Sequence, residues 1–421
     1  MQARLSPNHR DSPQLLAAQS LLRACVHCGF CNATCPTYQL LGDELDGPRG
    51  RIYLIKQLLE GHPPTATTQI HLDRCLGCRS CETTCPSGVR YAQLLESGRG
   101  LIEAQVPRPL PERLLRRLIL HLLPDPVRFQ RLLAAARILR PLLPPHLRRQ
   151  IPPAFPLQQP LHSDHGRRVL LLAGCVQPAL APQINAAAAR VLDRLGTAAT
   201  VADGCCGALA HHLPAREAGL AAMRRNIDAW VPYLDRGHEA IVSTASGCGL
   251  MIKEYHLYLQ HDREYAAKAA RVSAATLDLA EVIAASDLSG LRPAPRQRLA
   301  CHTPCTLQHG QRLAGKVEQI LTELGFILLA PVDSPACCGS AGSYSLLQPE
   351  LSAELLRVKL EALEIGQPDC IVTANIGCLA HMRSGTRRPV RHWIEVVDDA
   401  LRSSGECASA DARDRSAQTD P

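Results

Sequence analysis

Eight cysteines near the N-terminus, in two runs of identical spacing, constrain this chain more than any other feature. Each run reads C-x2-C-x2-C-x3-C, and a proline follows its last cysteine. The first run consists of Cys25, Cys28, Cys31 and Cys35, and the second of Cys75, Cys78, Cys81 and Cys85. Cysteines this dense in a chain of 421 residues favour metal ligands over a disulfide scaffold, which is typical of short secreted domains.

This spacing is typical of bacterial ferredoxins, in which the fourth cysteine of each run binds the other of two clusters. Three closely spaced thiolates can wrap one face of a cubane, whereas the fourth follows a turn that the proline helps to fix. The sequence therefore predicts two 4Fe–4S clusters with interleaved ligands. Cluster one takes Cys25, Cys28, Cys31 and Cys85, and cluster two takes Cys75, Cys78, Cys81 and Cys35. Two zinc sites are the alternative, which the dense quartets disfavour because zinc prefers paired ligands with open spacing.

The N-terminal segment and the hydropathy of the chain predict a cytoplasmic protein. The first twenty residues, MQARLSPNHRDSPQLLAAQS, contain no apolar core of a signal peptide. No apolar run approaches the roughly 18 residues that a membrane span requires. Clustered thiols in a reducing compartment again indicate metal binding.

Most of the formal net charge of +7 comes from one stretch that is rich in arginine, proline and leucine. Residues 108–150 hold ten arginines and two acidic residues, Glu112 and Asp125. Leucines recur among the arginines at helical spacing, which predicts short amphipathic helices interrupted by prolines. Such a face can lie on an anionic membrane or dock a partner, and a packed connector with solvated arginines is the alternative.

The region from about residue 167 to residue 400 contains an internal duplication. In each copy a strand-like segment ends in a cysteine, a helix and a second strand lead to a Cys-Cys-Gly group, and a helix and a third strand lead to a last cysteine. Strands that alternate with helices indicate parallel sheets covered by helices. The cysteines of copy one are Cys175, Cys205, Cys206 and Cys248, and those of copy two are Cys305, Cys337, Cys338 and Cys378.

These eight cysteines are placed where parallel sheets bind ligands, at the carboxyl ends of strands and close to helix N-termini. A third cluster, a zinc ion and a pair of buried structural dithiols are all compatible with the residues. Four nearby histidines could relay protons, although a structural role is the simpler interpretation: His302, His309, His381 and His392. Cys301, Cys370 and Cys407 have no predicted role, and Cys370 is expected to be a small core residue.

Several motifs resemble known iron–sulfur proteins. The helical insert between the runs makes the N-terminal module similar to the alpha-helical ferredoxin domains of succinate dehydrogenases and heterodisulfide reductases. The duplicated region resembles the cysteine-rich domains of heterodisulfide reductases and of two-component 2-hydroxy-acid dehydrogenases. The heterodisulfide reductase form ends each repeat in C-x-x-C, and here Ala245 and Asn375 occupy the first of those positions.

The stretches HTPCTLQHGQ, CCGSAGSY, IVTANIGC and VRHWIE, together with CVHCGFCNATCPTY and CLGCRSCETTCPSGV, resemble the iron–sulfur subunits of bacterial glycolate oxidase (glycolate dehydrogenase). This resemblance implies FAD-containing partner subunits that oxidise glycolate to glyoxylate. It also implies electron transfer through this chain to an acceptor such as membrane quinone, with peripheral contact to the inner membrane. The chain itself shows no G-x-G-x-x-G dinucleotide motif and no Walker loop, which is consistent with flavin chemistry in a partner.

The expected organisation is a multidomain α+β and α/β chain. It comprises a helical ferredoxin-type domain (15–105), a linker (106–166), two cysteine-rich repeats (167–290 and 291–402) and a disordered tail (403–421). The alternatives are a subunit of anaerobic glycerol-3-phosphate dehydrogenase and a heterodisulfide-reductase-like enzyme with its own site in the duplicated region. A nucleic-acid-binding protein is disfavoured, because only the basic linker supports it and aromatic residues make up 3% of the chain.

Overall fold

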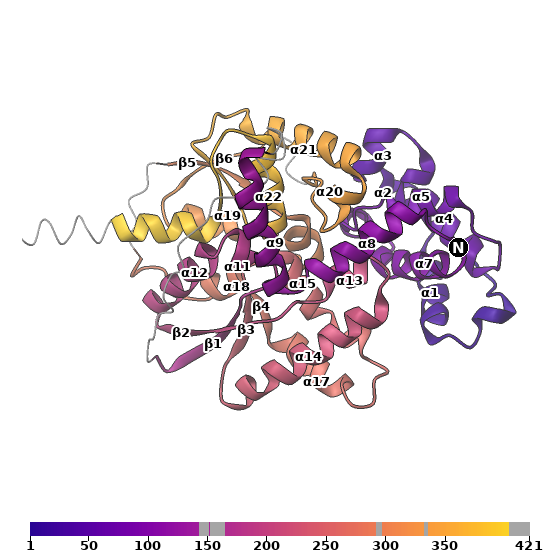
Figure 1. The fold of residues 1–421 in the computed structure, drawn as a ribbon, viewed down its shortest axis with the longest axis horizontal. Coiled ribbons are helices and arrows are strands. Elements are labelled where there is room, and N and C mark those ends of the chain that lie inside the picture. Colours follow the sequence, from indigo (N-terminus) through magenta and orange to yellow (C-terminus); the bar gives the residue numbers. More distant parts are fainter. Residues whose placement is uncertain (143–150, 152–164, 292–296, 332–335, 404–421) are drawn as a thin grey trace, which may run out of the picture.

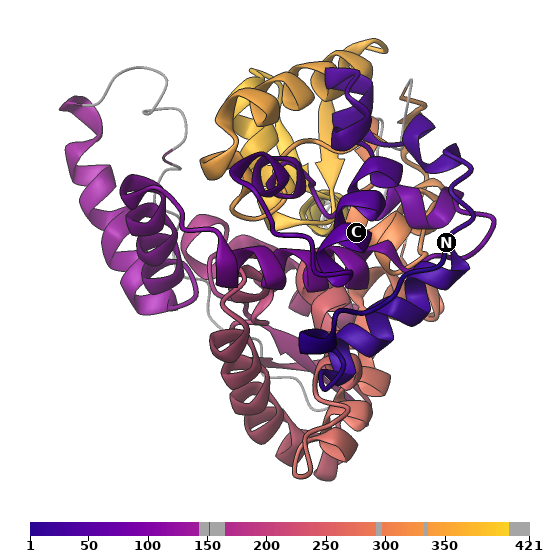
Figure 2. The same ribbon diagram turned by 90° about the vertical axis from the view of Figure 1, so that its right-hand side faces the viewer.

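The computed structural model describes residues 1–142, 151, 165–291, 297–331 and 336–403, and Figure 1 shows their arrangement. The tail predicted to be disordered, with Cys407, and much of the linker lie outside these residues. An N-terminal helical module is followed by two α/β units, so the predicted mixed multidomain class is confirmed. In Figure 2 the first unit lies at the bottom, the second at the top, and the helical module lies against both.

The helical module is built around two helices that carry its apolar core. Ile55 and Leu59 of α4 and Leu94 of α7 are fully buried there, as is Leu22 of α1. Prolines at the first position begin α1, α3 and α4, where the missing N–H costs no helical hydrogen bond. The helices are α1 (Pro13–Ala24), α2 (Phe30–Ala33), α3 (Pro36–Leu41), α4 (Pro48–Leu59), α5 (Ala66–Asp73), α6 (Ser80–Thr84) and α7 (Tyr91–Gln105).

The arginine-rich segment forms two helices, α8 (Leu110–Leu122) and α9 (Pro126–Leu139), which stand out from the body in Figure 2. Arg108 and Arg116 are buried. This differs from the alternative of a packed connector, which expected solvated arginines. Both pair with Asp73 at the end of α5 and with Glu112, which fixes the start of α8 to the helical module. In the part of the chain that the structure describes, no helix has the length and apolar content needed to cross a bilayer.

Each α/β unit contains a four-stranded sheet in which all neighbouring strands are parallel, as the duplication predicted. The strand orders are β2-β1-β3-β4 and β6-β5-β7-β8, so the two sheets have the same topology. The strands of the first sheet are β1 (Arg167–Leu172), β2 (Thr197–Ala202), β3 (Ala240–Ser243) and β4 (Thr276–Asp278). Those of the second are β5 (Arg298–His302), β6 (Ile327–Leu329), β7 (Cys370–Thr373) and β8 (Val390–His392).

Helices cover both sheets (Figure 1). The first unit contains α11 (Gln177–Leu180), α12 (Gln183–Arg194), α13 (Ala208–His212), α14 (Arg216–Asp235), α15 (Ser246–Lys253), α16 (Tyr255–Tyr258), α17 (Ala266–Ala275) and α18 (Leu279–Ala284). The second contains a π-helical turn (Thr306–Gly310), α19 (Lys316–Glu323), α20 (Tyr344–Leu347), α21 (Pro349–Glu364) and α22 (Ile376–Gly385). A last helical segment, residues 393–403, follows β8.

The two α/β units share one apolar core. Ile283 of α18, Leu321 of α19 and Trp393 of the last helical segment belong to the same cluster and are fully buried. The carboxylate of Asp398 accepts two hydrogen bonds from Arg190 of α12, with a shortest N···O distance of 2.6 Å. Because apolar surface from both copies is removed from water in one cluster, we expect the copies to unfold together.

This expectation can be tested because the chain has two tryptophans, Trp230 in the first copy and Trp393 in the second. Leu321→Ala should lower the free energy of unfolding by about 2–5 kcal/mol, the usual loss for a buried leucine. In Trp230→Phe and Trp393→Phe backgrounds, fluorescence during urea unfolding reports one copy at a time. Leu321→Ala should shift both transitions equally, and Ile365→Ala, at a position that is 66% exposed, should shift neither. A shift confined to the Trp393 signal would show that the copies unfold separately.

Candidate metal centres

Five cysteines line one cavity of the helical module: Cys25, Cys28, Cys31, Cys81 and Cys85. Cys25 caps the end of α1, Cys31 lies in α2 and Cys85 caps α6. Thus thiols from the second run join three from the first. The cavity contains the four cysteines that the spacing predicted for cluster one, together with Cys81, which also lines a second cavity. Binding of a cluster there stays a prediction.

A second cavity is lined by the complementary set: Cys35, Cys75, Cys78 and Cys81. Both three-cysteine loops have the same backbone form, with left-handed residues on either side of the central cysteine. These are His27 (φ 60°) and Gly29 (φ 87°) in the first run, and Gly77 (φ 65°) and Arg79 (φ 62°) in the second. Left-handed residues curl a chain sharply, which brings the flanking thiols toward a common point.

A buried ionic network surrounds Cys35. Asp46 is fully buried and accepts hydrogen bonds from Arg51, also fully buried, and from Arg74 at 3.4 and 2.8 Å. Arg51 donates to the Thr37 hydroxyl at 3.1 Å, and its Nη1 lies 4.0 Å from Cys35 Sγ. A buried cation beside thiolates offsets part of the charge that an iron–sulfur cluster with four thiolate ligands would carry.

The crowding of the thiols affects their protonation. Burial, followed by the neighbouring Cys25, raises the pKa of Cys31 to about 11. Burial also raises the pKa values of Cys78 and Cys81. These thiols therefore keep their protons at neutral pH unless a bound cation displaces them, which is the behaviour of metal ligands.

The cysteines of the first α/β copy meet at the carboxyl edge of its sheet. Cys175 follows β1, Cys205 and Cys206 follow β2, and Cys248 lies in the first turn of α15. The thiols of Cys175 and Cys206 donate hydrogen bonds to Cys205, which lowers the pKa of Cys205 below its ordinary value. The arrangement stabilises one thiolate among several thiols.

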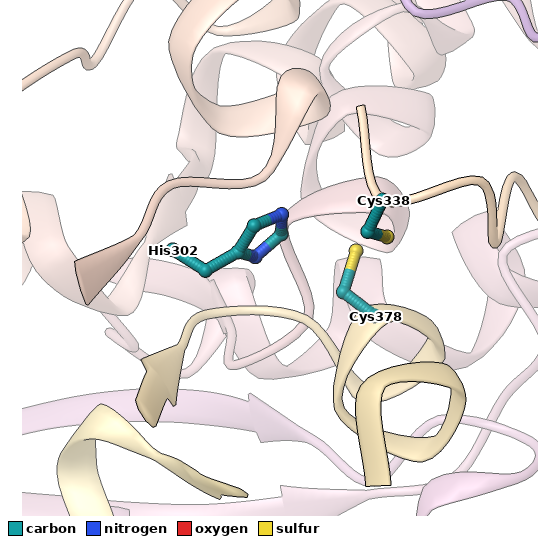
Figure 3. A group of neighbouring side chains, drawn as sticks. All are labelled: His302, Cys338 and Cys378. Atoms are coloured by element: carbon teal, nitrogen blue, oxygen red, sulfur yellow. The ribbon is translucent and has the colours of Figure 1, made fainter. Parts of the chain in front are cut away.

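In the second copy the thiols form a chain of contacts from Cys305 to Cys337, Cys338 and Cys378. His302, the last residue of β5, lies beside the end of this chain (Figure 3). A ring nitrogen of His302 and the sulfurs of Cys338 and Cys378 all lie within 4.8 Å of one another. Burial, and then the charge of Lys359, lower the pKa of His302 well below 6.5, so its imidazole is neutral.

The other three histidines make structural contacts. His309 Nδ1 lies 2.9 Å from Thr83 Oγ1, and His381 Nε2 lies 3.0 Å from Ser352 Oγ. His392 Nε2 lies 2.9 Å from the Thr244 carbonyl, and burial lowers the pKa of His392 to about 4. Of the cysteines without a predicted role, Cys301 and Cys370 are buried in strands β5 and β7.

The helical module contacts both α/β copies at its second cysteine run. Arg79 forms a bidentate ion pair with Glu254 of the first copy. The Tyr344 hydroxyl of the second copy donates to the Arg74 carbonyl at 3.1 Å. After burial, the charge of Cys305 contributes to the raised pKa of Cys78. The cysteines of the second cavity therefore lie near those of the second copy.

Two features of these sites were not predicted from the sequence. Arg51 stands on the same face of α4 as the buried Ile55 and Leu58, and a charged residue on an apolar helical face is a usable signal of a buried ion. The sequence does not distinguish His302 from the other three histidines, whereas the structure places it beside Cys338 and Cys378. The sequence does contain one clue to His302, because the matching position of the first copy is Leu172.

Comparisons with known proteins agree with this architecture. Residues 21–89 match the family of 4Fe-4S dicluster domains, and residues 169–253 and 299–383 each match the cysteine-rich domain family. The chain is similar to proteins of two kinds. A lactate utilization protein A of Bacillus velezensis is 26% identical over 55% of this chain and 99% of its own length. A probable glycolate oxidase iron–sulfur subunit of Bacillus subtilis is 32% identical over 86% of this chain and 89% of its own length.

The similarity to a third protein extends over almost the whole of both chains. The glycolate oxidase iron–sulfur subunit of Escherichia coli K12 is 54% identical over 95% of this chain and 99% of its own length. The match includes the helical module and both cysteine-rich copies in the same order. The resemblance found in the sequence motifs is therefore confirmed, and this chain belongs to the family of glycolate oxidase iron–sulfur subunits.

Proposed function

We propose that this chain is the electron-transferring subunit of a glycolate-oxidising complex. It takes electrons from an FAD-containing partner, in which glycolate loses two electrons and two protons to become glyoxylate, and passes them to a membrane quinone. The observation that carries the proposal is the convergence of eight cysteines on two adjacent cavities of one rigid helical module. Membership of the glycolate oxidase family supports the choice of substrate.

The residues of the two cavities fit 4Fe–4S clusters as donors. Each cavity offers four sulfur ligands, and each takes one of them from the other cysteine run. When bound, such clusters supply one-electron redox chemistry. The cavities share Cys81 and Tyr91 among their lining residues, so the two sites are neighbours within a few side chains of each other.

The protein residues around the second cavity hold this arrangement. Tyr91 is 4% exposed, and its hydroxyl lies 3.7 Å from Cys75 Sγ, where it can donate to the sulfur. Arg51 supplies a buried positive charge to the second cavity. Hydrogen bonds and charges of this kind set the potential of an iron–sulfur centre.

The outward face of α8 and α9 is the proposed contact with the membrane. Leu110, Leu114 and Leu118, spaced four residues apart on α8, are 74%, 66% and 52% exposed. Exposed arginines lie beside them at Arg113 and Arg117. An apolar stripe flanked by basic residues matches an interfacial helix on an anionic bilayer. Peripheral attachment there would keep the chain close to its quinone acceptor.

The cluster proposal predicts the effect of removing one thiol from the second cavity. Cys78→Ser should lower the iron content from about eight to about four per chain. It should also abolish glycolate-dependent dye reduction by the assembled complex. Cys370→Ala is the control, because Cys370 is fully buried in β7 and lines neither cavity. Full iron content and full activity in Cys78→Ser would contradict the proposal.

The membrane proposal predicts a loss of vesicle binding when charge enters the apolar stripe. Leu114→Glu should weaken binding to vesicles that contain anionic lipid by about tenfold or more, since it removes an apolar side chain that would enter the bilayer and adds repulsion from the lipid charge. Gln130→Glu adds the same charge at an exposed polar position of α9 and should have a smaller effect. Flotation on sucrose gradients measures both. Equal binding of Leu114→Glu and the unmodified chain would reject α8 as the contact.

A further inference from the structure

The second cysteine-rich copy contains three buried donors whose spacing differs from that of the other thiol groups. His302, Cys338 and Cys378 are 1%, 1% and 5% exposed, and their donor atoms lie within 4.8 Å of one another. Among the residues that the structure describes, no three sulfurs of either N-terminal cavity lie this close together. Figure 3 shows the imidazole ring directed toward the two sulfurs.

This spacing fits one metal ion better than a cubane. In a cubane each thiolate binds a different iron, so the ligands stand apart around the cluster. Around one zinc ion, zinc–sulfur bonds of about 2.3 Å in a tetrahedron place the sulfurs about 3.8 Å apart. The three donors reach that separation with small side-chain movements. Cys337 lies outside this group of three, but its thiol contacts that of Cys338, so it offers a fourth ligand for a Cys3His set.

The surroundings of the three donors have the form of an outer ligand shell. His302 Nδ1 lies 2.9 Å from Thr373 Oγ1, on the paired strand β7, which leaves Nε2 as the atom for a metal. The Asn375 amide donates to Cys378 Sγ at 3.5 Å, which favours a thiolate there. Hydrogen bonds from outer residues to the ligands are typical of metal sites and fix the ligand orientation.

The first copy differs from the second at two of these positions. Leu172 stands in the place of His302, and Ala245 in the place of Asn375. Leu172 ends β1 as His302 ends β5, and it lines the cavity that contains Cys206 and Cys248. The nitrogen ligand and the amide donor to its neighbouring thiol therefore occur together in one copy and are both missing from the other.

We propose that His302, Cys337, Cys338 and Cys378 bind a single zinc ion, and that this site exists in the second copy alone. The ion joins the end of β5, the Cys-Cys-Gly loop and the first turn of α22. Zinc carries no electrons, so the site would hold the second copy together beside the second cavity of the helical module. The inference does not depend on the proposed function, because it concerns a different set of ligands.

The test measures zinc and iron in the same anaerobically purified chain. We expect about one zinc per chain in addition to the iron of the N-terminal module, with zinc-edge X-ray absorption showing three sulfur ligands and one nitrogen ligand. His302→Leu, which copies the residue of the first copy, should lose the zinc and keep the iron. His381→Leu, a histidine of α22 outside the group, should keep both.

Two further variants keep the test decisive if His302→Leu fails to fold. His302→Cys should retain zinc and change its ligands to four sulfurs. Asn375→Ala should weaken zinc binding by about 10- to 100-fold in chelator competition, the usual effect of removing an outer-shell partner. Absence of zinc, zinc that persists in His302→Leu with unchanged ligands, or additional iron at this place would each overturn the proposal. Absence of iron from the N-terminal module of the unmodified chain would instead count against the proposed function.

Discussion

The interleaving of two cysteine runs around two cavities is the constraint on which the helical module depends. Neither run completes a set of four by itself, because Cys35 and Cys85 each belong with the opposite run. The 39 residues between the runs must therefore bring the chain back to the first run. They do so through α4, whose apolar face packs on α7 and whose Arg51 reaches the second cavity. The same helix thus supplies both the core of the module and the buried charge at Cys35.

The duplicated region shows how two copies of one fold can acquire different sites. Both sheets have the same strand order, and both place four cysteines at the carboxyl ends of their strands. The thiols of the first copy surround Cys205, whose pKa is lowered by the thiols that donate to it. In the second copy, hydrogen bonds between neighbouring thiols and then burial leave the pKa values of Cys305, Cys337 and Cys338 raised. Equivalent backbones therefore create different electrostatic surroundings through a few side chains.

Much of this architecture could be predicted from the sequence, because it rests on spacing and periodicity. The cysteine runs, the helical insert that became α4 and the order of strands in the duplication are all local patterns. Strands β4 and β8 were missed, since each has three residues and leads directly into a helix. The burial of Arg51 and the position of His302 beside Cys378 depend on contacts between distant segments, and no single-sequence pattern encodes such contacts. The proximity of Cys78 to Cys305 is of the same kind.

Because each cavity takes thiols from both runs, the order of synthesis decides when its ligands are complete. The first run leaves the ribosome about fifty residues before Cys85, so neither cavity has its full set of thiols until α6 has been synthesised. Until then the emerging segment exposes cysteines that can bind the wrong metal or be oxidised. Iron and sulfide for the proposed clusters can therefore be bound by the full sets of ligands only after Cys85 has been synthesised.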